Sequence, residues 1–447
     1  MGFDRGKFLV IAFVSLLSGL ATTGPFANAS HQAPPNPQFA VARYNQDGSL
    51  DPSFDANGTV LTRFSLSGIG EARAMAIDAN GKVVVAGFAE VFGSRQFALV
   101  RYNEDGSLDP SFGSNGMALT SFSLSTNAEA NAIAIGKSGK IVAAGFAEVF
   151  GGHRFAVACY NEDGSLDSSF GSNGMALTSF NLSGDARAKA VAIDANSKPV
   201  VAGFAEIFGS RQFALVRYNE DGSLDASFGS NGMALTSFGF NAQAEANALV
   251  IDENGKLVAA GFAETNVRRF AIVRYNQDGS LDASFGDGGV EVTGFGLNTN
   301  AEASAMAIDE DGKLVVAGYA EGGLLGLVIL RFAVVRYFDD GNLDQRFGGS
   351  GKVLTSFVGD AVANAVAIAR NRKIVAAGLA EEGGCCQFAL ARYNEDGNLD
   401  ASFDADGRVV TRFGVEGGLF VRKSVVRAIA IDRNGKVVVA GFGDSED

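Results

Sequence analysis

The string FALVRYNEDGSLDPSFGSNGMALTSF at Phe97–Phe122 occurs along this chain in seven related copies. Aligned on their leading aromatic residue, the copies are separated by 58, 58, 58, 57, 62 and 56 residues. The leading residues are Phe39, Phe97, Phe155, Phe213, Phe270, Phe332 and Phe388. A fixed period of this length, built from short β-rich runs, predicts a β-propeller or a solenoid. Because radial β folds grow by adding repeats, we expect one large domain in spite of the length of 447 residues.

Each repeat contains four runs that are typical of short β-strands. In one copy they are Ala74–Ile77, Lys82–Phe88, Phe97–Tyr102 and Met117–Phe122. An Asn-Gly turn at 80–81 joins the first two, and this dipeptide accepts positive φ at both central positions of a tight hairpin. The runs are apolar on both faces, as expected where a neighbouring sheet covers each side. Four antiparallel strands per repeat predict a propeller blade.

The two ends of the chain complement each other. Phe39–Tyr44 and Thr59–Phe64 match the third and fourth runs, with no first or second run before them. Val426–Ile431 and Val437–Phe442 match the first and second runs. A ring closed by two N-terminal and two C-terminal strands leaves no unpaired sheet edge. We therefore predict an all-β fold over residues 39–447, a seven-bladed β-propeller with four antiparallel strands in each blade.

The repeat resembles a known family. FALVRYNEDGSLDPSFG and AIDANGKVVVAGF are similar to the bacterial delta-60 repeat, and all seven copies carry its Asp-Gly, Leu-Asp and Phe positions. The resemblance covers Phe39–Phe442. It implies a β-propeller that is found mainly in exported proteins and whose function is uncharacterised. It brings no catalytic residues to this chain.

The first 29 residues have the features of a secretory signal peptide. Arg5 and Lys7 precede the apolar run Phe8–Ala21, and Ala27-Asn28-Ala29 is a small-x-small cleavage site. The alternative is a membrane anchor, but 14 apolar residues fall short of the roughly 20 that span a bilayer. Residues 30–38, which are rich in proline, are expected to form a disordered lead-in. We expect a secreted, periplasmic or cell-surface monomer with no membrane span in its mature chain.

The charge of the chain bears on its partners, and its cysteine content limits the possible disulfides. The formal net charge is −14 and no basic cluster stands out, so nucleic acid is excluded as a partner. Cys385 and Cys386 are adjacent and Cys159 lies far from them in sequence, which allows one strained vicinal disulfide or none.

One polar motif of the repeat suggests two different roles. Asn103, Asp105, Gly106 and Asp109 place several oxygen atoms within seven residues, as a calcium loop would. The motif lacks the alternating acids and the terminal glutamate of an EF-hand, however. The alternative is structural. Asp105-Gly106 then forms a turn, Asp109 caps a one-turn helix that begins at the following proline, and Phe112 fills the base of the blade. We expect no cofactor, with calcium as the alternative.

An arginine at the end of the third run recurs in six of the seven repeats. Arg101 is matched by Arg43, Arg217, Arg274, Arg336 and Arg392, whereas Cys159 replaces it once. A residue that holds the fold together is needed in every blade, whereas a catalytic centre is needed only once in the protein. The recurrence of the arginine therefore favours a structural role. We expect each buried arginine to pair with a carboxylate of its repeat, and we expect the repeat with Cys159 to contain a carboxylate without its partner.

The sequence offers little for catalysis. Its two histidines, His31 and His153, lie in the lead-in and in a loop, so that no histidine-based triad is predicted. The alternative is a propeller enzyme, a lyase or hydrolase, that uses carboxylates near a central channel for catalysis.

The loops between the second and third runs and between the fourth and first runs vary most, and both kinds emerge on one face. Functional differences collect on such loops, so we expect a protein or a small ligand to bind there, above all on blades five to seven. Recent duplication of the other blades is an alternative explanation for the variation. The contact residues that we predict are Leu324, Leu325, Leu327, Cys385, Cys386, Phe420, Arg422 and Lys423.

Overall fold

A computed structural model describes residues 37–64, 69–122, 125–180, 184–322, 328–413 and 423–444. These residues form 28 β-strands and no helix, which confirms the all-β prediction. The predicted signal peptide lies outside them, and the first strand begins at Pro37, within the predicted lead-in. In the parts of the chain that are described, no helix has the length and apolar character needed to cross a membrane.

Each repeat supplies four strands in a constant order. The first strands are β3 (Gly70–Ile77), β7 (Ser125–Ile135), β11 (Ala186–Ile193), β15 (Gln243–Ile251), β19 (Ala301–Ile308), β23 (Ala361–Ile368) and β27 (Ser424–Ile431). The second strands are β4 (Val83–Val91), β8 (Ile141–Val149), β12 (Pro199–Ile207), β16 (Leu257–Glu264), β20 (Leu314–Gly322), β24 (Ile374–Glu382) and β28 (Val437–Asp444). The third strands are β5 (Ser94–Tyr102), β9 (Gly152–Tyr160), β13 (Ser210–Arg217), β17 (Arg268–Tyr275), β21 (Ile329–Tyr337), β25 (Cys385–Tyr393) and β1 (Pro37–Tyr44). The fourth strands are β6 (Met117–Thr120), β10 (Met175–Thr178), β14 (Met233–Thr236), β18 (Val290–Thr293), β22 (Lys352–Thr355), β26 (Arg408–Thr411) and β2 (Thr59–Thr62).

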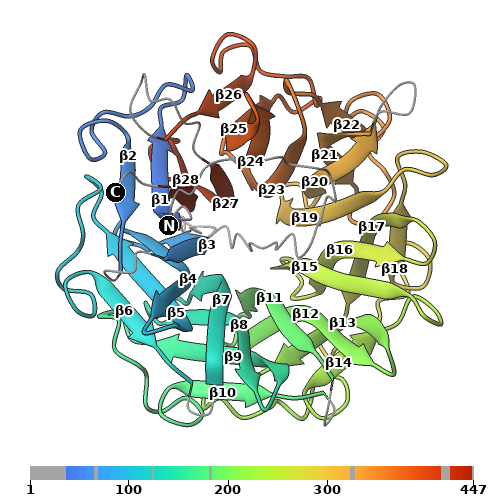
Figure 1. Ribbon diagram of the computed structural model, residues 1–447. Helices are drawn as coiled ribbons and strands as arrows, with labels where there is room; N and C mark the ends of the chain where they lie inside the picture. The colour runs from blue at the N-terminus through green and yellow to red at the C-terminus, as the bar shows by residue number, and fades with distance from the viewer. Residues whose placement is uncertain are drawn as a thin grey trace, which may run out of the picture.

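Within a sheet the strands pair antiparallel, first to second to third to fourth. β11–β14 and β15–β18 count as one eight-stranded sheet because a single parallel bridge, Arg211 to Gln243, joins them. Strands from the two ends of the chain form one antiparallel sheet in the order β2-β1-β28-β27. Figure 1 shows the sheets arranged around a common centre, with the first strands innermost and the fourth strands on the outside.

Apolar side chains fill the space between neighbouring sheets. The first strands carry alanine and valine, and their small side chains allow the sheets to approach closely near the centre. Farther out, the phenylalanine with which we aligned each repeat lies within the third strand and packs against the one that follows the fourth strand, edge-on in six of the seven described pairs. Phe97 and Phe122, for example, have ring centroids 4.9 Å apart. Such pairs stabilise the sheet beyond the burial of their area.

A β-bulge interrupts every first strand at the same place. In β3 the pairing with β4 shifts between Ala72 and Ala74, so that Arg73 has no partner residue. The other first strands shift at the corresponding residue. Opposite the bulge lies Gly87, where an added Cβ atom would be only 1.9 Å from the carbonyl oxygen of Glu71. Only glycine fits there, and the same close approach recurs at Gly145, Gly203, Gly261, Gly318, Gly378 and Gly441.

The turn after the first strand differs from our prediction. Only Gly81 has positive φ, at 80°, whereas an Asn-Gly turn of the predicted type needs it at Asn80 as well. The physical reason is the side chain of Asp78, whose Oδ1 accepts hydrogen bonds from the main-chain N–H groups of Asn80 and Lys82. This carboxylate organises a wider turn, in which one left-handed residue is enough.

The second and third strands extend beyond their predicted ends and meet in a tight hairpin. Val91 pairs with Ser94, which leaves Phe92 and Gly93 as a two-residue turn with φ of 51° and 78°. Phe150-Gly151 and Phe208-Gly209 form the same turn in the next two repeats. These segments, which we predicted as variable loops, are therefore two-residue turns at the tips of regular hairpins.

Replacing Gly87 by alanine should destabilise the fold, because the new methyl group would overlap the carbonyl oxygen of Glu71. We expect a loss of about 3 kcal/mol in the free energy of unfolding, as for other overpacked sites. Gly93→Ala is the control, since its Cβ meets no atom within 4 Å and only its positive φ costs about 1 kcal/mol. Urea unfolding of both variants measures the difference, and equal losses would contradict the steric explanation.

Candidate functional site

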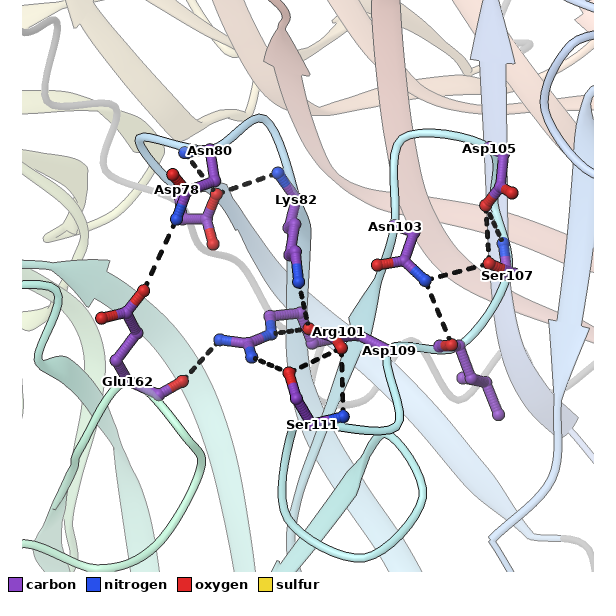
Figure 2. Close-up of polar contacts among 11 residues, drawn as sticks. Asp78, Asn80, Lys82, Arg101, Asn103, Asp105, Ser107, Asp109, Ser111 and Glu162 are labelled. Atoms are coloured by element: carbon purple, nitrogen blue, oxygen red, sulfur yellow. Dashed lines mark hydrogen bonds and ion pairs between the residues drawn. The ribbon is translucent and has the colours of Figure 1, made fainter.

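The recurring arginine lies at the centre of a polar cluster on the face that carries the turns between first and second strands. In Figure 2, Arg101 donates from Nε to Oδ2 of Asp109 at 2.6 Å and from Nη2 to Ser111 Oγ at 3.1 Å. Its Nη1 donates to the main-chain carbonyl of Glu162 in the next repeat. The guanidinium also lies 4.8 Å from the ring centroid of Phe112. Arg101 thus links its own turn to the adjacent repeat.

Both oxygen atoms of the Asp109 carboxylate accept hydrogen bonds from the protein. Besides Arg101 it contacts Lys82 Nζ at 2.7 Å, and its Oδ1 accepts from the N–H and hydroxyl of Ser111. Burial alone would raise the pKa of Asp109, but the hydrogen bonds that it accepts outweigh burial and hold the pKa well below its ordinary value. Asp51, Asp225, Asp282 and Asp400 have the same arrangement in other repeats.

The repeat that contains Cys159 corrects one prediction. Its carboxylate, Asp167, is not left alone, because Lys140 Nζ lies 2.6 Å from Oδ2 and Ser169 donates to Oδ1. These hydrogen bonds lower the pKa of Asp167 to about 2. The sequence-based prediction overlooked the lysine, which each equivalent cluster shares with the arginine.

Asp105 and Gly106 form the predicted turn, and Oδ1 of Asp105 accepts hydrogen bonds from the N–H and hydroxyl of Ser107. No helix follows at Asp109. The chain makes a turn there instead, because the Asp109 side chain binds the N–H of Ser111 directly. The motif's oxygens thus accept hydrogen bonds from the protein, and the described residues contain no group of three or more His, Cys, Asp or Glu suited to a metal ion.

The bulge of each first strand presents a polar residue among apolar neighbours, near the centre of the molecule. We call these residues the axial set: Arg73, Asn131, Lys189, Asn247, Ser304, Asn364 and Arg427. Six of them are buried, with Arg73 7% exposed and Asn364 completely covered. Bulges turn single side chains away from the ordinary strand pattern, and here they turn polar ones inward.

The three asparagines of the axial set join neighbouring sheets. Each donates from Nδ2 to a main-chain carbonyl of the next first strand: Asn131 to Ala188, Asn247 to Ala303 and Asn364 to Val426. The Oδ1 atom of each is buried and has no hydrogen-bond partner among the described residues. A buried acceptor left in this state costs about 1–3 kcal/mol.

Two charged residues of the axial set, Arg73 and Lys189, contact glutamates of a second layer, which lies two residues earlier in the first strands. Glu129 forms ion pairs with Arg73 and Arg95. Glu245 forms an ion pair with Arg211, and Nζ of Lys189 lies 3.8 Å from its carboxylate. In the next repeat, Glu302 accepts hydrogen bonds from Arg268 and Asn247. Burial raises the pKa of Glu302 in spite of these contacts.

The axial set is absent from the sequence-based predictions, which treat the first strands only as runs of small apolar residues. A signal was present in the repeats, since all seven first strands carry a polar residue after an alanine or valine at the same place. Examples are EARAMA at 71–76 and EANAIA at 129–134. What one strand cannot reveal is the bulge that turns this residue inward.

His153 also differs from our prediction. It lies within β9 rather than in a loop, and its Nδ1 is 2.7 Å from Oδ1 of Asp185. Arg187 contacts the same carboxylate at 3.3 Å. A pocket beside them is lined by Phe150, Arg154, Ser179 and Phe180 among others.

The predicted contact residues divide into two groups. Leu324, Leu325, Leu327, Phe420 and Arg422 lie outside the described residues. Cys385 and Cys386 open β25 and are thiols, since neither belongs to a disulfide. Burial raises the pKa of both thiols, which makes them poor nucleophiles. Lys423 precedes β27, with its Nζ 5.7 Å from the ring centroid of Phe442.

Large apolar side chains protrude from the face that carries the variable loops. Phe92 and Phe208, at hairpin tips, have 103% and 101% of their surface exposed. A bulky residue at positive φ is strained, and asparagine or glycine would suit such a turn better. We call the exposed residues of this face the apolar tips: Phe92, Phe150, Phe208, Phe240, Leu297 and Val358.

Comparison with known proteins places the chain in a family. A family model described as a domain of unknown function (DUF5122) β-propeller matches seven segments that together make up half of the chain. They are residues 33–54, 79–112, 137–170, 197–228, 253–285, 310–347 and 370–403. The protein belongs to this DUF5122 β-propeller family. The predicted kinship with a propeller repeat of uncharacterised function is confirmed, and no curated protein sequence matches the chain.

Solved structures with a similar architecture include three enzymes. The polysaccharide lyase Uly1 is 11% identical, with a TM-score of 0.45 over 84% of this chain and 90% of the lyase. The periplasmic gluconolactonase PpgL of Pseudomonas aeruginosa is 12% identical, with a TM-score of 0.43 over 81% and 94%. The PQQ-bound aldose sugar dehydrogenase of Streptomyces coelicolor is 12% identical, with a TM-score of 0.38 over 83% and 94%. At these values the similarities say nothing of this propeller's function.

The repeat itself supplies a test of the arginine cluster. Arg101→Cys should destabilise the propeller by about 2 kcal/mol, because it removes hydrogen bonds to a buried carboxylate. Cys159→Arg should stabilise it by a similar amount, since Asp167, Ser169 and Phe170 already lie where Arg101 finds Asp109, Ser111 and Phe112. Urea midpoints of both variants measure the effects. A destabilised Cys159→Arg protein would show that its repeat has closed over the site.

The same carboxylates predict the response to acid. The pKa of Asp167 is lower in the folded protein than the value of about 3.9 in an unfolded chain. Its contribution to stability is therefore complete above about pH 4 and is lost as pH falls through about 2. Thermal unfolding of wild type and Asp167→Asn between pH 7 and pH 2 tests this. The difference between their melting temperatures should shrink below pH 4, and a constant difference would be inconsistent with the ion pair.

Proposed function

We propose that this protein is an exported binding module, and that a partner protein docks on the face that carries the apolar tips. The propeller that presents this face has seven blades, each of four strands, and the ring is closed by β1 and β2 with β27 and β28. The pairing of β1 with β28 supports this closure, as does the hydrogen bond from Tyr44 to Thr411. The proposed export depends on the signal peptide predicted from the sequence.

The apolar tips are the observation that carries the proposal. Packing does not explain Phe92, Phe150 and Phe208, because almost all of their surface faces solvent. Turn geometry does not explain them either, because phenylalanine is disfavoured at positive φ. Exposed aromatic side chains on two-residue hairpin turns are well suited to insert into recesses of a partner, because an aromatic side chain has few rotamers to order.

The position of the tips extends the expected contact beyond blades five to seven. The hairpins between second and third strands and the loops between fourth and first strands emerge on the same side of each sheet. We propose that the segments 323–327 and 414–422, whose sequences carry Leu324, Leu325, Leu327, Phe420 and Arg422, belong to the same docking face.

The alternative function is a propeller enzyme that uses carboxylates near the centre. The raised pKa of Glu302 favours it, because a protonated carboxyl group can act as a general acid. Against it, Glu129 and Glu245 each contact two cationic side chains of the protein, so that their oxygen atoms are already occupied. The structure therefore supports binding better than catalysis.

A triple variant with asparagine at Phe92, Phe150 and Phe208 separates binding from folding. Asparagine tolerates positive φ, so the variant should unfold at the same temperature as wild type or higher. Immobilised wild-type and variant proteins are exposed to an envelope extract of the source cells. The partner should be retained by the wild type and depleted at least tenfold on the variant, and calorimetry with the purified partner should show the same difference. Equal retention of every bound protein would refute the docking face.

A further inference from the structure

A pocket of about 180 Å³ lies beside the hairpin that joins β8 to β9. Its wall is formed by that hairpin, by Ser179 and Phe180 after β10, and by the start of β11 in the next repeat. Phe150, at the tip of the hairpin, lines the pocket and is 84% exposed. The pocket therefore lies between two neighbouring repeats and borders solvent.

Glycine at residue 152 leaves space in this part of the molecule. The corresponding hairpin turns of two other repeats are followed by Ser94 and Ser210, whereas Gly152 stands here. A Cβ atom added to Gly152 would meet, among the described residues, only the carbonyl oxygen of Gly184, at the ordinary contact distance of 3.9 Å. Both glycines line the pocket. A side chain at residue 152 would therefore fit and would reduce the free space.

Arg154 supplies the pocket with a positive charge that the protein leaves unpaired. Its half-buried side chain forms no ion pair and no hydrogen bond with the described residues, and none of the described lining residues is Asp or Glu. Asp185 lies between two lining residues in the chain, but its carboxylate contacts His153 Nδ1 at 2.7 Å and Arg187 Nε at 3.3 Å. The guanidinium of Arg154 is thus available to a carboxylate, which it can bind through two parallel hydrogen bonds.

Aromatic rings form another part of the wall. Phe150 and Phe180 both line the pocket, and the ring of Phe180 is held by Phe155, with centroids 5.0 Å apart. An apolar cavity of roughly 150 Å³ is large enough for benzene, whereas pockets for drug-sized ligands begin at roughly 300 Å³. The volume and the lining together select a ligand that carries one small apolar group beside one negative charge.

We propose that the pocket beside β8 and β9 binds a small carboxylate whose apolar body is about the size of a benzene ring. The carboxylate pairs with Arg154, and the apolar body packs against Phe150 and Phe180. The site borders the docking face, because Phe150 is one of the apolar tips. A free acid needs no partner protein, however, so its binding is measured on the isolated protein and the result is independent of whether a partner docks.

A ligand-observed NMR titration of the full-length mature protein near neutral pH tests the site, with benzoate as the probe. Benzamide has nearly the same shape without the charge, and acetate has the charge without the ring. Benzoate should bind saturably, and both matched compounds should bind roughly tenfold more weakly, because each lacks one of the two contacts. No saturable binding of benzoate, or equal binding of either matched compound, would overturn the proposal.

One pair of variants assigns the charge contact. Arg154→Gln installs the residue that other repeats carry at this place, as at Gln96 and Gln212, so the variant should fold normally. It should weaken benzoate binding roughly tenfold and leave benzamide binding unchanged. Arg269→Gln is the matched control, since Arg269 has the same place in another repeat and also forms no ion pair with the described residues. Unchanged benzoate binding in Arg154→Gln, or an equal loss in Arg269→Gln, would refute the role of Arg154 and with it the proposal.

A third variant tests the pocket itself. Gly152→Val places a β-branched side chain in a strand, next to the carbonyl oxygen of Gly184 and without overlap, so the fold should be retained. Because the new side chain takes up free space, binding of benzoate and benzamide should both be lost. Thermal unfolding of each variant verifies that it is folded. Benzoate binding that persists unchanged in a folded Gly152→Val protein would show that the ligand binds elsewhere and would overturn the proposal.

Discussion

The close approach of the first and second strands determines how tightly each sheet packs and which side chains face the centre. At Gly87 and its six equivalents, the backbone of the first strand comes so near that no side chain fits. The first strand accommodates the contact with a bulge, and the bulge residue turns toward the centre. One steric constraint, repeated in every sheet, thus produces both tight packing and a polar interior. The residue type at the bulge is then free to vary, from Arg73 to Ser304.

At the opposite end of the sheets, a second constraint holds neighbouring repeats in register. Arg101 binds Asp109 within its own repeat and the carbonyl of Glu162 in the next. Because the cluster is buried and charged, it tolerates little rearrangement, although Lys140 compensates in part where Cys159 stands in place of arginine. The face that carries the turns between first and second strands is accordingly uniform. Differences among repeats are found near the centre and on the face that carries the apolar tips.

The sequence repeat made the architecture predictable. The conformations of individual turns and bulges were not predictable, because they depend on local side-chain interactions. Strand positions followed from apolar runs that recur seven times. The turn at Asn80 was wrong, because the Asp78 carboxylate reorganises it, and the hairpin at Phe92 was missed, because phenylalanine is not a residue that such turns favour. Arg73 and its equivalents were visible as polar residues in alanine-rich strands. Their burial depends on pairing with another strand, which periodicity in one strand does not report.

The pairing of β1 with β28 distinguishes one sheet from all the others. Every other four-stranded unit is assembled from strands of a single repeat, whereas this one joins residues from opposite ends of the chain, such as Tyr44 and Val437. Contacts so distant in sequence form slowly, because a long loop must close first. We therefore expect this sheet to be the last to assemble when the chain folds, because β1 can pair with β28 only after Val437–Asp444 has been synthesised.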